Sequence, residues 1–181
     1  MIKKILQKIF KKFSYYFFLK IYGKIENSIK FDEDKRIKTN HIKFEKDRKY
    51  KIYQIEDARV YTDRIHNTAV ILENKIIEGP SFQLKNNNNS EIYNNIVFER
   101  GTPRQLRKLN GTVLSLLTGG GGNTNYWHWL YDVLPRLKLC EKVKKIEDIN
   151  HFILPSLEKK FQKETLDKLN IDEHKILSSE K

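Results

Sequence analysis

The chain is organised around residues 119–137, which read GGGGNTNYWHWLYDVLPRL. A glycine run allows positive φ angles and lets a ligand approach the main-chain N–H groups, and a helix that starts there presents unpaired donors to an anion. The apolar residues 111–118 before the run predict a strand. We therefore expect strand, turn and helix in succession, with the turn at the carboxyl end of a parallel sheet, where ligands bind in such folds.

The helix predicted after the glycine run has two unlike sides. A 3.6-residue period places one apolar set together, expected to pack on the sheet: Tyr126, Leu130, Val133, Leu134 and Leu137. On the other side, His128, Asp132 and Arg136 follow one another at four-residue spacing. One interpretation is a helix-stabilising Asp–His pair and an Asp–Arg ion pair. The other is a histidine oriented by a carboxylate, able to accept a proton or contact a phosphate.

Three further residues bear on the function and the shape of this helix. Trp127 and Trp129 flank the histidine, and their indole rings are suited either to covering a sugar or base ring or to core packing. Pro135 lacks a backbone N–H, so we expect a kink close to Arg136.

Working outward, strands and helices alternate on the C-terminal side. Strands are expected at 111–118, 151–155 and 175–178, and helices at 125–142 and 157–169. This alternation predicts βαβ units on a parallel sheet with right-handed crossovers. So few strands leave unpaired edges, and we expect these units to be part of a larger α/β domain.

Short apolar segments on the N-terminal side predict a small antiparallel sheet. Their expected limits are 51–55, 58–61, 68–72, 75–77 and 82–84. We therefore divide the chain into a helix at 1–30, a charged connector at 31–49 and a folded body at 50–181. The body comprises a β-rich lead-in at 50–100 and βα units at 101–181.

Residues 1–30 predict an amphipathic helix with a cationic side. Its apolar positions are Ile2, Ile5, Leu6, Ile9, Phe13, Tyr16 and Phe17, and its lysines are Lys3, Lys4, Lys8, Lys11 and Lys12. Such a helix can lie in the headgroup layer of an anionic membrane. Packing on its own domain or on a partner is the alternative.

The bulk composition narrows the class of partner. The 181 residues include 35 Lys and Arg against 23 Asp and Glu, a net charge of +12 that permits an anionic partner but also fits an AT-rich coding sequence. A nucleic-acid partner is not expected, because the folded body lacks RNP-like strands, zinc-finger spacing and a basic recognition helix.

Cys140 is the single cysteine and cannot form an intrachain disulfide. The histidines are too scattered to suggest a metal site.

Residues 125–137 resemble the central motif of glycosyltransferase family 61, an aromatic residue, His-Trp, two residues, Asp, two residues and Pro-Arg. The segments 58–61, 70–71 and 77–82 look like the β-rich entry of that family, and the resemblance covers about 56–178. It implies the N-terminal Rossmann-like half of a GT-B fold. It also implies inverting transfer of a sugar from a nucleotide-sugar donor to a hydroxyl of a glycan acceptor, in the biosynthesis of a surface polysaccharide, capsule or lipopolysaccharide.

The same resemblance implies a set of site residues. His128 and Asp132 match the catalytic positions, and the expected substrate contacts are Gly120, Gly121, Gly122, Asn123, Asn125, Trp129 and Arg136. The individual roles of His128, Asp132 and Arg136 stay open. No metal and no cofactor is expected, since the nucleotide sugar is a substrate.

The chain departs from the family by ending where the second GT-B domain is expected. We therefore expect a missing C-terminal domain or a partner chain to complete the cleft, and little transfer by residues 1–181 alone, because half a cleft gives up the alignment of donor and acceptor. The expected location is the cytoplasm, peripheral at the inner face of the cell membrane. The alternative function is a non-catalytic glycan- or partner-binding remnant at the membrane surface.

Overall fold

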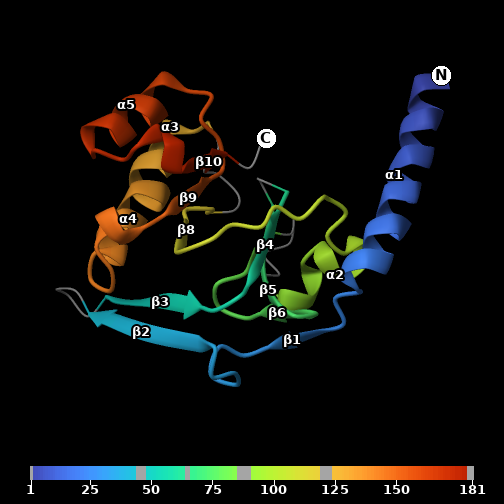
Figure 1. Cartoon of the computed structure of the whole chain (residues 1–181), viewed down its shortest axis with the longest axis horizontal. Coiled ribbons are helices and arrows are strands. Elements are labelled where there is room, and N and C mark those ends of the chain that lie inside the picture. Colours follow the sequence, from blue (N-terminus) through green and yellow to red (C-terminus); the bar gives the residue numbers. More distant parts are fainter. Residues whose placement is uncertain (1, 44–47, 64–65, 85–90, 119–123, 179–181) are drawn as a thin grey trace.

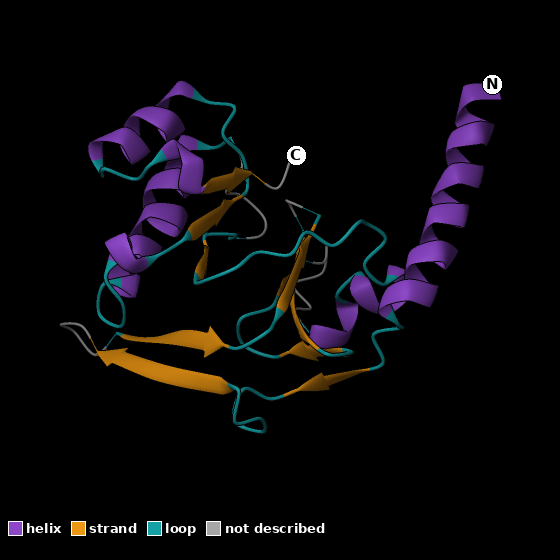
Figure 2. Cartoon of the chain, viewed as in Figure 1, coloured by secondary structure: helices purple, strands orange, loops and turns teal. Residues whose placement is uncertain are grey.

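The computed structural model describes residues 2–43, 48–63, 66–84, 91–118 and 124–178, and it is a mixed α/β structure, as predicted (Figures 1 and 2). A long helix, α1 (Ile2–Tyr22), extends from one side of the molecule. A β-rich part follows it, and the C-terminal part alternates strands with helices.

The C-terminal part contains a parallel sheet of three strands in the order β10-β9-β8. These strands are β8 (Val113–Ser115), β9 (His151–Leu154) and β10 (Ile176–Ser178). The register pairs Leu114 with Phe152 and Leu177 with Ile153. Between β9 and β10 lie α5 (Lys160–Lys168) and η4 (Glu173–Lys175). The predicted alternation of strands and helices is confirmed in this part of the chain.

The described residues 124–150 between β8 and β9 contain one helical segment in three pieces, followed by a short turn. The pieces are α3 (Tyr126–His128), the π-helical turn η2 (Trp129–Val133) and α4 (Leu134–Cys140), and η3 (Ile146–Asp148) leads into β9. In the wide turn the N–H of Leu134 donates to the carbonyl of Trp129. Pro135 follows at once and has no N–H to continue the ladder, so the predicted perturbation near Arg136 takes the form of a π-helical turn.

The core of the C-terminal part is built from the helical segment and the sheet. Its buried residues are Leu116, Trp129, Val133, Leu137, Cys140, Ile149, Phe152, Leu154, Leu166 and Ile171. The prediction of the apolar face was therefore wrong at its first residue. Trp129 occupies the buried position, whereas Tyr126 is 56% exposed.

The β-rich part contains a five-stranded sheet, β1-β6-β5-β4 with β7 also on β5. Its strands are β1 (Asn27–Ile29), β4 (Arg59–Thr62), β5 (Asn67–Leu72), β6 (Lys75–Ile77) and β7 (Phe82–Gln83). All pairs are antiparallel except β1 with β6, which is parallel. The short helices η1 (Ile92–Asn94) and α2 (Val97–Arg100) follow, and Val97 packs in the same core as Ile71.

Residues 31–49, predicted as a charged connector, include a strand in their described part. They contain β2 (Ile37–Lys43), which pairs antiparallel with β3 (Lys49–Ile55) along seven residue pairs. Ile37 is buried against the five-stranded sheet, while Lys38 and Lys43 face solvent. The charged side chains of this segment therefore occupy exposed positions of a strand, which composition alone did not distinguish from a loop.

The end of α1 is also earlier than predicted. Gly23 has a φ of 78° and its N–H donates to the carbonyl of Leu19, a left-handed helix stop that favours glycine. Beyond it, Ile25 and Ile29 are buried in two separate clusters of the β-rich part. Residues 23–30 therefore belong to the sheet region rather than to the helix.

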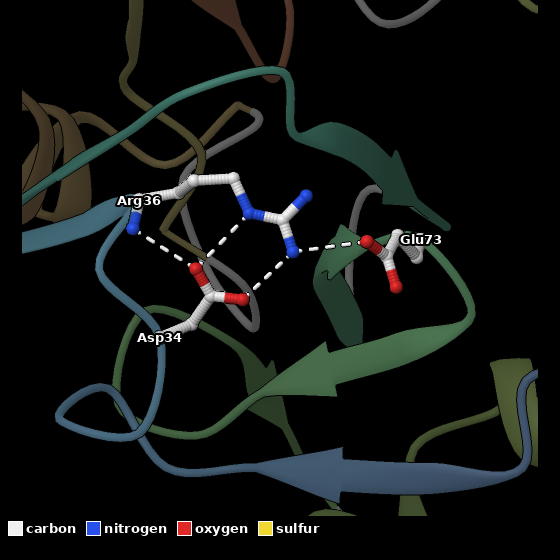
Figure 3. Close-up of polar contacts among 3 residues, drawn as sticks. All are labelled: Asp34, Arg36 and Glu73. Carbon is white, nitrogen blue, oxygen red and sulfur yellow. Dashed lines mark hydrogen bonds and ion pairs between the residues drawn. The ribbon is translucent and has the colours of Figure 1, made fainter.

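An ion-pair network fastens the loop before β2 to the β5–β6 turn (Figure 3). The Arg36 guanidinium donates to both carboxylate oxygens of Asp34, at 3.0 and 2.7 Å, and to Glu73 at 3.0 Å. The Arg36 backbone N–H also donates to Asp34, at 2.9 Å. These hydrogen bonds from the Arg36 side chain and backbone lower the pKa of Asp34 from 3.8 to about 2.

Acid should therefore weaken the fold through Asp34. Because the folded-state pKa is depressed, the contribution of Asp34 is present above pH 4 and is lost as the pH falls from about 4 to about 2. We expect Asp34→Asn to reduce the loss of unfolding free energy across this window, measured by urea denaturation at several pH values. Glu158→Asn, at an exposed site, is the control. Identical acid profiles for wild type and Asp34→Asn would contradict the assignment.

Candidate functional site

The helical segment that carries the site begins at Asn125. This residue has extended backbone angles, and its side-chain oxygen accepts a hydrogen bond from the N–H of Trp127 at 2.9 Å, which caps the helix. The expected ligand contacts at Gly120, Gly121, Gly122 and Asn123 lie outside the described residues. A substrate contact by Asn125 stays a prediction beside its capping role.

His128 and Asp132 form the hydrogen-bonded pair that their spacing predicts. His128 Nδ1 lies 2.6 Å from Asp132 Oδ2, with side chains that are 39% and 48% exposed. This contact occupies Nδ1 and leaves Nε2 as the ring nitrogen that can exchange a proton with a substrate. A carboxylate on Nδ1 favours the tautomer with a proton on that nitrogen, so that Nε2 can act as a base.

Arg136 has a different role from the expected carboxylate ion pair. Its Nε donates to the backbone carbonyl of Asp132 at 3.0 Å, and its Nη1 donates to the carbonyl of Leu117 at 2.9 Å. Burial lowers the pKa of this guanidinium, and the charge of Asp132 acts in the opposite direction. Leu117 lies two residues beyond β8, so Arg136 ties the helical segment to the carboxyl end of that strand. A phosphate contact by Arg136 stays a prediction.

Loss of this tie should destabilise the C-terminal part. We expect Arg136→Met to lower the free energy of unfolding by about 2 kcal/mol, because two carbonyls lose a charged donor. Arg136→Lys should recover little of it, since an ammonium cannot reproduce the two-pronged geometry. Urea denaturation measures both, with the exposed Arg107→Met as the control. A change below 0.5 kcal/mol, about the size of an ordinary surface effect, would contradict the role.

The two tryptophans have opposite environments. Trp129 is fully buried and its indole N–H lies 3.4 Å from Thr165 Oγ1. The expectation that Trp129 contacts a substrate was therefore wrong, because its ring lies in the core of the C-terminal part. Trp127 is 64% exposed and lies against Tyr131, with ring centroids 4.3 Å apart. Tyr131 was missed, although its four-residue spacing from Trp127 was a usable signal.

The side chains of His128 and Asp132 are partly exposed. One surface hollow, of about 340 Å³, is lined by Glu78, Gly79, Ser81, Phe82, Gln83 and Ile92, and another, of about 400 Å³, lies along α1. Neither is lined by His128, Asp132 or Arg136. Within the described part of the chain, no three His, Cys, Asp or Glu side chains are grouped as metal ligands.

Comparisons with protein-family models, with curated proteins and with solved structures found no match. The function must therefore be inferred from the site itself and from its motif.

Proposed function

We propose that this chain carries the acceptor side of an inverting glycosyltransferase that uses a nucleotide-sugar donor. The observation that carries the proposal is the exposed His128–Asp132 pair, 2.6 Å apart, on a helical segment tied to the carboxyl end of β8. Its support is the motif at residues 125–137, which resembles that of glycosyltransferase family 61. In this proposal the three-stranded parallel sheet belongs to the Rossmann-like first half of a GT-B fold.

The proposed reaction uses His128 as the general base. A hydroxyl of the glycan acceptor gives its proton to Nε2 while its oxygen forms a bond to the anomeric carbon of the donor sugar. The bond from that carbon to the phosphate oxygen breaks, and the nucleoside diphosphate leaves with the electron pair. Asp132 holds the imidazole ring and stabilises the imidazolium that forms. Arg136 acts as a positioning residue through the carbonyls of Asp132 and Leu117.

The acceptor would lie across the exposed aromatic pair. Trp127 and Tyr131 flank His128 on the same surface segment and present ring area that the core does not use. Such rings pack against the apolar face of a sugar, and their rigidity makes this contact inexpensive in conformational entropy. The donor half of the cleft would come from a C-terminal domain or a partner chain.

Saccharide binding tests the proposal directly. We expect a panel of oligosaccharides titrated into residues 1–181 to include ligands that shift the NMR signals of the His128 and Trp127 rings. Trp127→Ala should weaken binding about fivefold to tenfold, as expected for loss of one aromatic contact of about 1 kcal/mol. Tyr16→Ala, which removes an equally exposed ring from α1, should not. Failure of every saccharide to shift these signals would refute the proposed acceptor site.

A non-catalytic glycan-binding protein is the second candidate, and the Trp127–Tyr131 surface favours it because that surface needs no donor site. The two functions differ in what His128 does. In a binding protein, His128→Gln changes affinity only, and no nucleoside diphosphate is released when donor, acceptor and the completing polypeptide are present. In a transferase the release occurs and depends on His128.

A further inference from the structure

Helix α1 leaves a continuous apolar surface uncovered. Eight of its large apolar side chains are between 50% and 69% exposed: Ile5, Leu6, Ile9, Phe10, Phe13, Tyr16, Phe17 and Ile21. At 100° per residue these positions fall on one side of the helix, over a length of about 30 Å for 21 residues. Large exposed apolar surfaces of this kind mark a site of interaction.

The helix does contact the rest of the molecule, but with a different side. Tyr15 donates its hydroxyl hydrogen to the carbonyl of Glu99 at 3.1 Å, and the Tyr22 hydroxyl accepts from the N–H of Leu106 at 2.8 Å. Phe18 stacks on Tyr22, with ring centroids 5.6 Å apart. These contacts anchor the C-terminal half of α1 beside α2 and leave its N-terminal half extending from the body (Figure 1). The exposed apolar side therefore has no partner among the described residues.

The charges on α1 indicate which partner fits. Its lysines, all exposed, are Lys3, Lys4, Lys8, Lys11, Lys12 and Lys20, and residues 2–22 contain no Asp or Glu. A second copy of α1 could cover the apolar side but would leave the lysines without acidic side chains to pair with them. A nucleic acid would satisfy the lysines but not the apolar side chains. An anionic lipid surface satisfies both sets.

We propose that α1 binds an anionic membrane surface, lying in the plane of the headgroups with its apolar side inserted and its lysines on lipid phosphates. No helix in the part of the chain that the structure describes has the length and apolar character needed to cross a membrane. The anchored end at Tyr15, Phe18 and Tyr22 would hold the folded body against that surface. This inference is independent of the proposed transferase function.

Point substitutions on the exposed sides test the proposal while sparing the fold. Removing residues 1–30 would also remove β1 and the buried Ile25 and Ile29, so that deletion would confuse binding with unfolding. The apolar variant is Leu6→Gln with Phe13→Gln, and the cationic variant is Lys4→Gln, Lys8→Gln and Lys11→Gln. Matched controls elsewhere are Leu84→Gln with Leu169→Gln, and Lys142→Gln, Lys163→Gln and Lys168→Gln, all at exposed positions.

Co-sedimentation with vesicles of phosphatidylcholine and phosphatidylglycerol, against vesicles of phosphatidylcholine alone, is the measurement. We expect binding to the anionic vesicles only, reduced at least tenfold in the apolar variant. The cationic variant should bind the anionic vesicles roughly 100-fold more weakly, because each of its three lysines contributes about fivefold to the affinity. Both controls should bind as wild type, and circular dichroism should show equal folding for all.

Several results would overturn the proposal. One is equal binding to the neutral and the anionic vesicles, and another is no binding to either kind of vesicle. A third is binding of the apolar and cationic variants as tight as that of the wild type. Self-association that the apolar variant abolishes, without vesicle binding, would instead assign the surface to a second copy. Binding to DNA or RNA as tight as binding to the anionic vesicles would show that α1 binds polyanions in general.

Discussion

Replacing Trp129 by alanine is expected to lower the free energy of unfolding by about 3–5 kcal/mol, the range found for large aromatic side chains in cores. The indole is fully buried, and its ring centroid lies 6.2 Å from that of Phe161 on α5. It shares one cluster with Leu116 next to β8 and Phe152 on β9. The substitution therefore opens a cavity where the helical segment, α5 and the sheet meet. Urea denaturation followed by circular dichroism measures the loss.

Trp127→Ala is the matched control, since the same residue type is removed two positions earlier in the same helical segment. Trp127 is 64% exposed, and its main described contact is the Tyr131 ring. We expect a loss of about 1 kcal/mol or less, as for one exposed aromatic pair. Equal losses in the two variants would show that the core is not built on Trp129.

The strands of the chain were predictable because their signal is local. Short apolar segments between turn residues located β4, β5 and β6 to within about two residues, within the usual uncertainty of element boundaries. The alternation of strand and helix after residue 111 likewise predicted the parallel sheet. In both regions the hydrophobic period agrees with the packing that the tertiary structure provides.

Pairing partners were not predictable in the same way. The β2–β3 ribbon joins residues 37–43 to 49–55, and the dense charge of this region predicted a connector where β2 forms. β1 lies parallel to β6, nearly fifty residues later in the chain, a pairing that no local pattern encodes. Such contacts depend on the complete fold, which places distant segments at one sheet edge.

The candidate site shows the same division. The His128–Asp132 contact follows from a spacing of four residues on a helix, and the structure confirms it. The partner of Arg136 is a backbone carbonyl at Leu117, which every residue type possesses, so no side-chain pattern announces it. The burial of Trp129 rather than Trp127 agrees with helical spacing, because Trp129 lies four residues before Val133 and eight before Leu137 in the same core.

Replacing His128 by glutamine is expected to reduce sugar transfer by a factor of about 10² to 10⁴, the usual contribution of a general base. Glutamine retains a polar side chain at the exposed position but cannot take up the acceptor proton. Asp132→Asn should have a similar though smaller effect, because the imidazole loses the carboxylate that orients it at 2.6 Å. Transfer is measured as release of nucleoside diphosphate, with the polypeptide that supplies the donor half of the cleft.

The control for this prediction is His174→Gln, an exposed histidine in η4 outside the helical segment that carries His128, which should leave transfer unchanged. The values of kcat and KM distinguish a general base from a group that only binds the acceptor. If His128 is the base, His128→Gln should lower kcat far more than it raises KM. An imidazole that acts in the transition state must affect the rate even when the acceptor is saturating. A His128→Gln variant with more than a tenth of the wild-type kcat would remove His128 from the reaction and leave the aromatic pair as the functional part of this surface.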